Sequence, residues 1–288
     1  MYVFRGQANS SIPSICGSVK RSMNFRKGFN KIIISSLNNY YNLEMDSDHI
    51  FTALNQMRGS FAFYCRRKDE PAIFLANTDR FSSASLIKVP ILLAWAWLER
   101  RGELSLDELC DLDGEEQVRG AGFARAMRAR RLPFHDVLLM MIATSDNLCT
   151  NLAIRRVGLE RLNALFHNEL GLPGCELQRK LMDFVARERG LDNWVSAQDC
   201  IRLFELVHGL PAQQRAWVEA MLLSCQDSSL LMRGQARDRL HFYHKTGSIS
   251  GVLHDWGFTR ECDIFLLTSG FQSEADANEV FAEAGEFL

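Results

Sequence analysis

The chain has 288 residues, of which 47% are hydrophobic and 24% charged, and its formal net charge at pH 7 is −2. These proportions are ordinary for a soluble globular protein, and a chain of this length can bury a large core without disulfides or metals. Because the chain lacks a basic excess, and because its longest apolar run (Val89 to Leu98) is too short to cross a bilayer, we expect neither a nucleic-acid partner nor a membrane anchor.

The N-terminal segment differs in composition from the rest of the chain. Residues 1–43 carry six basic side chains, no Asp or Glu, and many Ser and Asn. They lack the apolar core of a secretory signal and only faintly resemble a transit peptide. We interpret residues 1–44 as an extension that is non-native or disordered, with Met23 or Met45 as alternative starts, and residues 45–288 as one domain.

The predicted elements indicate an α+β fold. Strands are expected at Ser60–Arg66 and Pro71–Asn77, joined by a charged turn. Strands return near the C-terminus at Leu240–Lys245, Val252–Thr259 and Asp263–Gly270, and a last helix starts at Ser273. We therefore expect an antiparallel sheet built from about 45–80 and 236–288, with both chain ends contributing.

The middle of the chain, about 85–235, is mostly helical by its hydrophobic pattern. The segments that favour helices are Leu104–Leu112, Phe134–Ile142, Asn147–Val157, Glu160–Leu170 and Ala197–Val207. This stretch should form an all-helical region packed against the sheet.

The cysteines and histidines argue against a metal site. The eight cysteines are widely scattered and form no Cys-x-x-Cys, and the histidines form no His-x-His or His-Glu-x-x-His. We expect free thiols, no metal and no cofactor. We interpret His244 as a strand residue, and His254 and Asp255 as polar groups at a sheet edge.

The first motif with chemical content is Ser85-Leu-Ile-Lys88. Residues three apart share a helix face, so the hydroxyl and the amine should meet. The apolar run that follows predicts a buried helix, with Ser85 at its N-terminus, where the helix dipole favours developing negative charge. Pro90 should distort the start of this helix.

Two further motifs follow in the chain. Ser145-Asp-Asn147 lies between two predicted helices, and Lys245-Thr-Gly247 closes a predicted strand. Each would be rare by chance, and the ordered set of three is much rarer.

Together the three motifs resemble the signature of class A β-lactamases and penicillin-binding proteins. The resemblance covers about residues 50–288. It implies a β-lactamase/transpeptidase-like fold, in which an antiparallel sheet from both chain ends is flanked by helices beside an all-helical region, and it makes residues 45–288 a catalytic domain.

The chemistry of the motif residues agrees with that resemblance. A serine nucleophile needs a base, and Lys88 can serve if burial beside Lys245 lowers its pKa. Ser145 can carry a proton to the leaving nitrogen, and Asn147 can hydrogen-bond a substrate amide. Residues 245–248 are expected to contact the substrate.

Each residue from Lys245 to Ser248 has its own expected role. Lys245 and Thr246 offer a charge and a hydroxyl to a substrate carboxylate, and Gly247 follows them in the motif. The resemblance implies that the backbone N–H groups of Ser85 and Ser248 form an oxyanion hole.

One departure from the family pattern concerns deacylation. Class A enzymes carry a Glu-x-x-Leu-Asn segment, but the matching region here begins at Leu177 and has no Glu in that place. Arg179 and Asp192 could pair to hold this loop. Asp183 is the nearest acid and the candidate base for the deacylating water, with a structural role for it left open.

The leading hypothesis is a serine β-lactamase that forms an acyl-enzyme on Ser85. The alternatives are a penicillin-binding-protein-like D-Ala-D-Ala carboxypeptidase or esterase, and a β-lactam sensor that stays acylated. We expect a small β-lactam or peptidoglycan-like substrate and a monomer. The family suggests a periplasmic or secreted protein, whereas the lack of a recognisable signal peptide allows a cytoplasmic one.

Overall fold

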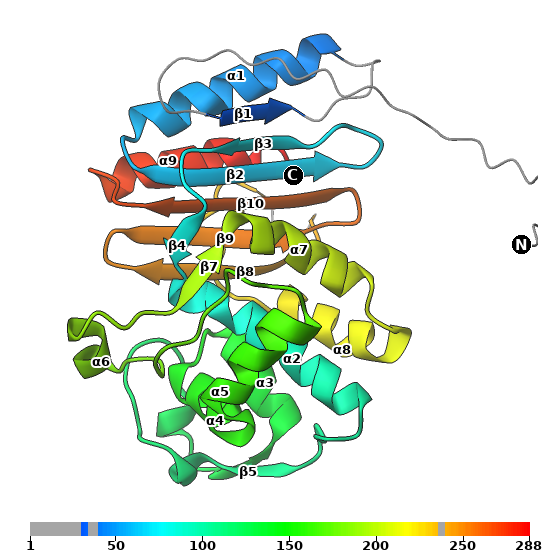
Figure 1. Ribbon diagram of the computed structural model, residues 1–288, viewed down its shortest axis with the longest axis vertical. Coiled ribbons are helices and arrows are strands. Elements are labelled where there is room, and N and C mark those ends of the chain that lie inside the picture. Colours follow the sequence, from blue (N-terminus) through cyan, green and yellow to red (C-terminus); the bar gives the residue numbers. More distant parts are fainter. Residues whose placement is uncertain (1–29, 34–39, 236–239) are drawn as a thin grey trace, which may run out of the picture.

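The computed structural model of the chain describes residues 30–33, 40–235 and 240–288 (Figure 1). Within these ranges a six-stranded sheet runs in the order β1–β3–β2–β10–β9–β8, and every neighbouring pair is antiparallel. The strands are β1 (Asn30–Ile33), β2 (Ser60–Arg67), β3 (Ile73–Ala76), β8 (Tyr243–Ile249), β9 (Val252–Phe258) and β10 (Cys262–Ser269).

The two ends of the chain meet where β2 pairs with β10. The two strands are paired along their whole length, from Ser60 opposite Ser269 to Arg67 opposite Cys262. This pairing confirms the expected sheet from both ends. It also makes β8 an edge strand, and β8 carries the third motif.

Each face of the sheet has its own core, because successive side chains of a strand point to opposite faces. On one face Phe63 and Leu266 pack with residues of α1 (Tyr40–Gln56) and α9 (Glu274–Gly285). On the other face Tyr64 stacks on Phe204 of α7 at a ring-centroid distance of 5.9 Å, which ties the sheet to the helical region.

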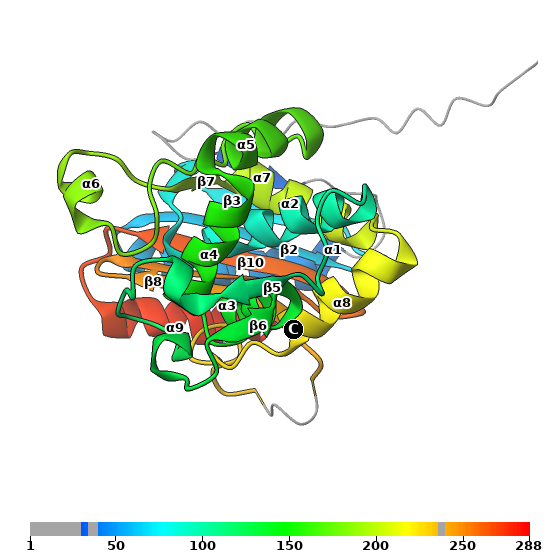
Figure 2. The same cartoon turned by 90° about the horizontal axis from the view of Figure 1, so that it is seen from below.

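The helical region lies at one end of the sheet in Figure 1 and nearest the viewer in Figure 2. Its central helix, α2, is buried along almost its whole length, as the apolar run predicted. The helices are α2 (Lys88–Arg100), α3 (Phe134–Ala143), α4 (Asn147–Val157), α5 (Leu159–Ala164), a π-helical turn (Leu165–Glu169), α6 (Phe184–Glu188), α7 (Ala197–His208) and α8 (Ala212–Leu223).

Two small ribbons brace this region. β4 (Arg80–Ser82) pairs with β7 (Trp194–Ser196), which joins the segment before Ser85 to the end of the 178–192 loop. β5 (Leu109–Asp111) pairs with β6 (Arg131–Pro133) on the far side of the helices.

Some sequence-based expectations were wrong. Leu104–Leu112 does not form a helix, because Ser105 and Asp111 accept hydrogen bonds from backbone N–H groups two residues later and favour turns instead. β8 starts at Tyr243, not Leu240, and extends to Ile249. Where the sheet was expected to begin, residues 45–56 belong to α1, whose Ile50 and Leu54 are four apart and share a buried helix face.

Two described elements start before the expected boundary of the domain at residue 45. β1 pairs with β3, and α1 begins at Tyr40, so both elements start within the segment interpreted as an extension. The part of that expectation concerning residues 1–29 and 34–39 lies outside the described residues.

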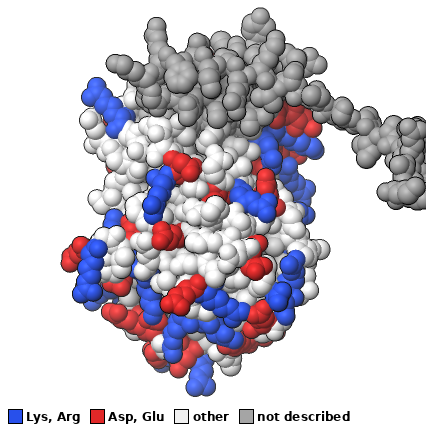
Figure 3. Space-filling model, in the orientation of Figure 1, with Lys and Arg blue, Asp and Glu red and all other residues white. Residues whose placement is uncertain are grey.

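The surface charges and the helices relate to the expectation of no nucleic-acid partner and no membrane anchor. On the face shown in Figure 3, the coloured side chains of both signs are interspersed. In the described ranges, every helix is too short or too polar to span a bilayer.

Candidate active site

Ser85 lies in a short 3₁₀ helix (Ala84–Ile87) that leads directly into α2. Ala84 has a φ of +45°, a strained conformation for a residue with a side chain, and such strain commonly marks functional sites. Ser85 is partly exposed, whereas Leu86 and Ile87 are buried. The expected helix distortion near Pro90 takes the form of this 3₁₀ turn, and Pro90 itself lies in the first turn of α2, where proline is tolerated.

Lys88 joins the first two motifs. Its Nζ donates to Ser85 Oγ at 3.0 Å, to Ser145 Oγ at 2.9 Å and to Asn147 Oδ1 at 3.1 Å, and it lies 2.7 Å from the backbone oxygen of Ser145. The side chain is fully buried. Burial and, next, the charge of Lys245 hold the pKa of Lys88 well below its ordinary value. A neutral amine beside a serine hydroxyl can act as a general base.

The second motif is shaped by Asp146. Its carboxylate caps α4 by accepting the Cys149 N–H at 3.0 Å, and it also accepts the Ala124 N–H at 2.8 Å. A side chain on Gly122 would collide with this carboxylate. Ser145 itself has a φ of +55°. The central residue of the motif is therefore structural, and it holds Ser145 and Asn147 toward Lys88.

The third motif approaches Ser85 from β8. A Cβ on Gly247 would lie 3.0 Å from the Leu86 nitrogen and 3.2 Å from the Ser85 nitrogen, so glycine permits β8 to pack against the serine backbone. Lys245 is buried and its Nζ donates to the backbone oxygen of Thr246 at 2.6 Å. Burial lowers the pKa of Lys245. Ser248, which follows the Lys245-Thr-Gly247 motif, is exposed.

Asp227 is a site residue that sequence reasoning missed. Its carboxylate accepts the Thr246 hydroxyl at 2.9 Å, and also the Ser229 hydroxyl at 2.6 Å. Burial raises the pKa of Asp227, but these hydrogen bonds and the charge of Lys245 outweigh burial and lower it. No motif in the sequence marked this residue, because it comes from the loop after α8 and meets β8 only in the fold.

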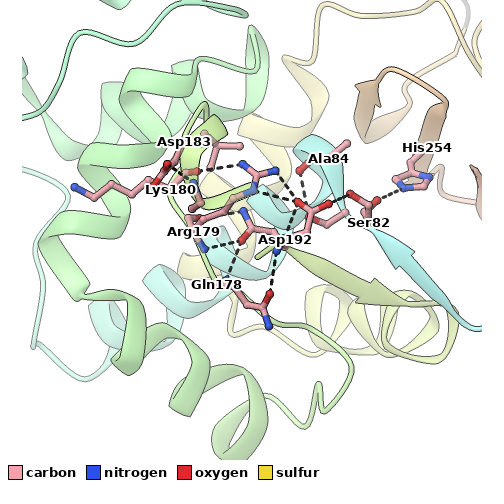
Figure 4. Close-up of polar contacts among 12 residues, drawn as sticks. Ser82, Ala84, Gln178, Arg179, Lys180, Asp183, Asp192 and His254 are labelled. Atoms are coloured by element: carbon pink, nitrogen blue, oxygen red, sulfur yellow. Dashed lines mark hydrogen bonds and ion pairs between the residues drawn. The ribbon is translucent and has the colours of Figure 1, made fainter. Parts of the chain in front are cut away.

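The 178–192 loop is fixed by an ion pair shown in Figure 4. Arg179 Nη2 donates to Asp192 Oδ1 at 2.6 Å, which confirms the expected pair, and both side chains are largely buried. Asp192 Oδ2 accepts the Ser82 hydroxyl at 2.6 Å, and His254 donates from Nε2 to the Ser82 backbone oxygen at 2.8 Å. This chain of contacts connects the loop, the strand before Ser85 and the sheet.

Asp183 occupies a different kind of position from Ser85, Lys88 and Ser145. It is exposed, and it caps α6 by accepting the Ala186 N–H at 2.9 Å. Leu181, two residues earlier, is instead held by Asn151, which accepts its N–H at 2.8 Å and donates to its carbonyl at 3.0 Å. Among the described residues, the side chains that accept hydrogen bonds from Lys88 Nζ are those of Ser85, Ser145 and Asn147.

The structure confirms the interpretation of His244 but not that of His254 and Asp255. His244 is in strand β8 as expected. His254 and Asp255 are completely buried within β9, which lies between β8 and β10, so their assignment to a sheet edge was wrong. In the described ranges, no group of His, Cys, Asp and Glu is arranged to hold a metal.

The family model described as the β-lactamase enzyme family matches residues 47–287. The chain belongs to the β-lactamase enzyme family. That match covers all three motifs and both halves of the sheet. No curated protein matches the chain in sequence.

Solved structures share the fold at low sequence identity. A β-lactamase from Sphaerobacter thermophilus is 22% identical with a TM-score of 0.74, covering 84% of this chain and 95% of that one. PBP-A is 21% identical with a TM-score of 0.74, covering 85% and 94% of the two chains. An ancestral class A β-lactamase is 19% identical with a TM-score of 0.73, covering 84% and 98%. The chain therefore has the mixed helix and antiparallel-sheet fold of class A β-lactamases.

Proposed function

We propose that this chain is a serine hydrolase that opens β-lactams by forming an acyl-enzyme on Ser85. The observation that supports the proposal most strongly is the buried Lys88, whose amine contacts the hydroxyls of both Ser85 and Ser145. No side chain elsewhere in the described ranges has this set of contacts with two serines, and the pKa of Lys88 is lowered toward that of a usable base.

The proposed acylation moves one proton and exchanges one bond for another. Lys88 takes the proton from Ser85 Oγ, which attacks the ring carbonyl, and an Oγ–C bond forms. The backbone N–H groups of Ser85 and Ser248 hold the oxyanion, and losing one such donor typically costs about 3 kcal/mol of barrier. The ring C–N bond then breaks, Ser145 donates its proton to the nitrogen, and Lys88 passes the proton from Ser85 to Ser145. The adduct therefore carries the whole mass of the β-lactam.

The substrate contacts in this proposal come from the other motif residues. Asn147 holds the side-chain amide of the substrate while keeping its contact with Lys88. Lys245 and Thr246 face the carboxylate end, and Gly247 leaves room for β8 to lie against Ser85. We propose that the active unit is a monomer, since all of these groups come from one chain.

Deacylation is the step in which this chain departs from class A enzymes. We propose that the acyl-enzyme is long-lived, because the candidate base of the 178–192 loop, Asp183, is exposed and engaged as a helix cap. Asp183 can act as the base for the deacylating water only after the loop shifts. Among the neighbours, a variant of PBP-A with penicillin G was solved as an acyl-enzyme complex; it is 21% identical to this chain, with a TM-score of 0.74 over 85% of this chain and 95% of that one.

Intact-mass spectrometry during incubation with penicillin G tests the proposal. We expect a one-to-one adduct that persists well beyond the time needed to form it. Ser85→Ala should give no adduct, whereas Ser83→Ala, which removes a buried hydroxyl two residues away, should still be acylated. An adduct on Ser85→Ala, or none on the wild type, would contradict the proposal.

The same assay separates the candidate functions. Release of hydrolysed penicillin with a transient adduct would favour a β-lactamase, and Asp183→Asn should then slow release without slowing adduct formation. A permanent adduct would favour the sensor. Turnover of a D-Ala-D-Ala peptide or an ester would favour the carboxypeptidase or esterase.

A further inference from the structure

Two buried cysteines meet across the pair of strands that joins the two ends of the chain. Cys65 Sγ of β2 lies 3.6 Å from Cys262 Sγ of β10, and the two residues are 197 positions apart in the sequence. Both side chains are buried, with exposed fractions of 2% and 4%. Neither thiol takes part in the acylation proposed above.

The contact between the two thiols follows from the register of the sheet. In the pairing of β2 with β10 (Figure 1), Cys65 stands opposite Ile264, and Cys262 stands opposite Arg67. Cys262 and Ile264 are two residues apart and project to the same face, so Cys65 and Cys262 are diagonal neighbours on that face. Both belong to the core on the side of α1 and α9. The strand pairing therefore directs the two thiols toward one another.

This contact distinguishes the pair from the other described cysteines. In the part of the chain that the structure describes, seven cysteines are free. Within those ranges, the one pair of cysteine sulfurs at hydrogen-bond distance is that of Cys65 and Cys262. Cys110 Sγ, by contrast, faces the backbone oxygen of Asp111 at 3.9 Å. Two thiols in contact are the starting arrangement for a disulfide.

The end of β10 can supply the remaining approach. A disulfide requires a sulfur–sulfur distance of about 2.0 Å. Cys262 is the first residue of β10, and it follows a turn in which Arg260 and Glu261 are exposed. Thr259 closes this turn, because its Oγ1 accepts the N–H groups of Glu261 at 3.1 Å and of Cys262 at 3.0 Å. Side-chain rotation and a small shift at this turn can therefore join the sulfurs without moving the middle of the sheet.

Burial decides when the two thiols can react. The hydrogen bond with Cys262 and burial hold the pKa of Cys65 well above its ordinary value, so the reactive thiolate is scarce in the closed fold. An oxidant therefore reaches the thiols when this end of β10 opens locally, which exposed turns at strand ends do more readily than the core.

We propose that Cys65 and Cys262 form a redox site, which closes into a disulfide on exposure to a small disulfide oxidant such as oxidised glutathione. The bond would join β2 covalently to β10, and with them the N-terminal and C-terminal parts of the sheet. The site lies in the core on the side of α1 and α9, whereas Leu86 and Ile87, which follow Ser85, belong to the core on the other face. The proposal therefore does not depend on the proposed function.

The exchange with oxidised glutathione balances in two steps. The thiolate of one cysteine attacks a sulfur of oxidised glutathione, a mixed disulfide forms, and one glutathione thiolate leaves. The second cysteine then loses its proton and attacks the protein sulfur of the mixed disulfide, so that the Cys65–Cys262 bond forms and the other glutathione thiolate leaves. The two glutathione thiolates take up the two protons, and two electrons pass from the protein to glutathione.

Peptide mapping tests the proposal. The folded full chain is incubated with oxidised glutathione in urea below the unfolding transition, quenched with acid, unfolded with N-ethylmaleimide and digested with trypsin without reduction. Cleavage after Arg58, Arg66 and Arg260 makes Cys65 the one cysteine of peptide 59–66 and Cys262 the one cysteine of peptide 261–288. We expect these peptides as one cross-linked species, lighter than their sum by two hydrogens and separated by dithiothreitol.

Variants and stability assign the bond to this pair. Cys110→Ser, which removes another buried thiol, should still give the cross-linked species, whereas Cys65→Ser and Cys262→Ser should each give none. The oxidised wild type should unfold at a urea midpoint about 1 M higher than the same protein with dithiothreitol, because a link between residues 197 positions apart constrains the unfolded chain.

The peptide map of the wild type decides on its own, because a serine at either buried position can destabilise the fold. Recovery of both peptides blocked by N-ethylmaleimide overturns the proposal. Recovery of either peptide joined to glutathione or to another cysteine, in place of the Cys65–Cys262 species, overturns it as well.

Discussion

The two sides of the candidate active site differ in their polar contacts. On the side of α2 and β8, the amine of Lys88 is within hydrogen-bond distance of the hydroxyls of Ser85 and Ser145, and Lys245 and Thr246 lie on β8. On the side of the 178–192 loop, the polar contacts fix the loop itself: Arg179 pairs with Asp192, and Asp183 caps α6. Under the proposed function, the difference teaches that a chain can keep the groups for forming an acyl-enzyme while its loop carboxylates stabilise the structure.

The comparison predicts that losing Lys88 has the largest effect on acylation. Lys88→Ala removes the base that touches both serines, and general-base catalysis typically contributes about 100- to 10,000-fold. We expect the rate of penicillin adduct formation, measured by stopped reaction and intact mass, to fall about 1,000-fold. Lys180→Ala, which breaks only the ion pair of the loop lysine with Glu115, should change that rate less than threefold. A fall of less than tenfold in the rate of adduct formation by the Lys88→Ala variant would contradict the proposed role of Lys88 as the base.

The loop ion pair should matter for folding more than for acylation. Asp192→Ala leaves the largely buried Arg179 without its carboxylate, and breaking such a pair is costly. We expect the free energy of unfolding in urea to fall by about 3 kcal/mol. Arg202→Ala, which removes the exposed pair with Glu205, should cost less than about 1 kcal/mol. If the two variants were equally stable, the loop would not depend on this pair.

His254 should make stability depend on pH. The His254 side chain donates to the Ser82 carbonyl from Nε2 and accepts the Thr268 N–H at Nδ1, which requires a neutral ring. Burial lowers its pKa from 6.5 to about 4. Because the folded pKa is depressed, the unfolded chain binds a proton first as pH falls below 6.5, and stability is lost down to about pH 4.

The size of that loss can be measured against a variant. Between pH 6.5 and pH 5, His254 should cost the wild type about 2 kcal/mol of unfolding free energy. His254→Gln cannot titrate, so its loss over the same interval in urea unfolding should be smaller by that amount. Equal losses in the two proteins would mean that folding does not lower the pKa of His254.

Asp227 should give the smallest effect, and it sharpens the comparison on the substrate side. Its carboxylate binds the hydroxyl of Thr246, where a substrate carboxylate is proposed to lie. Asp227→Asn removes a like charge, and because the site is open to water the gain should be about 1 kcal/mol, or roughly fivefold in acylation by penicillin G. Glu279→Gln, an exposed acid on α9 with the same charge change, should have no effect. An unchanged rate in Asp227→Asn would place the substrate carboxylate elsewhere.

The sequence was informative where short-range chemistry and periodicity decide the outcome. The three motifs identified Ser85, Lys88 and Lys245, and the buried run after Ser85 predicted α2. It was less informative where side chains compete locally with the backbone, as in Leu104–Leu112, or where a helix lies at the start of the region assigned to the sheet, as in α1.

Other features could not be read from spacing at all. Asp227 meets Thr246 only because the loop after α8 returns to the edge of the sheet. His254 is buried because β9 lies between β8 and β10. That strand order cannot be deduced from the spacing of residues in the sequence.

The pairing of β2 with β10 also has a consequence for synthesis on the ribosome. Arg66 and Asp263, which bond across these strands, are 197 positions apart in the chain. Ser85, the proposed nucleophile, therefore emerges long before Lys245 of β8, whose charge helps to lower the pKa of Lys88, and loops of this length close slowly during folding. Under the proposed function, the acylation site is therefore complete only after the last strands of the chain have been made and have paired.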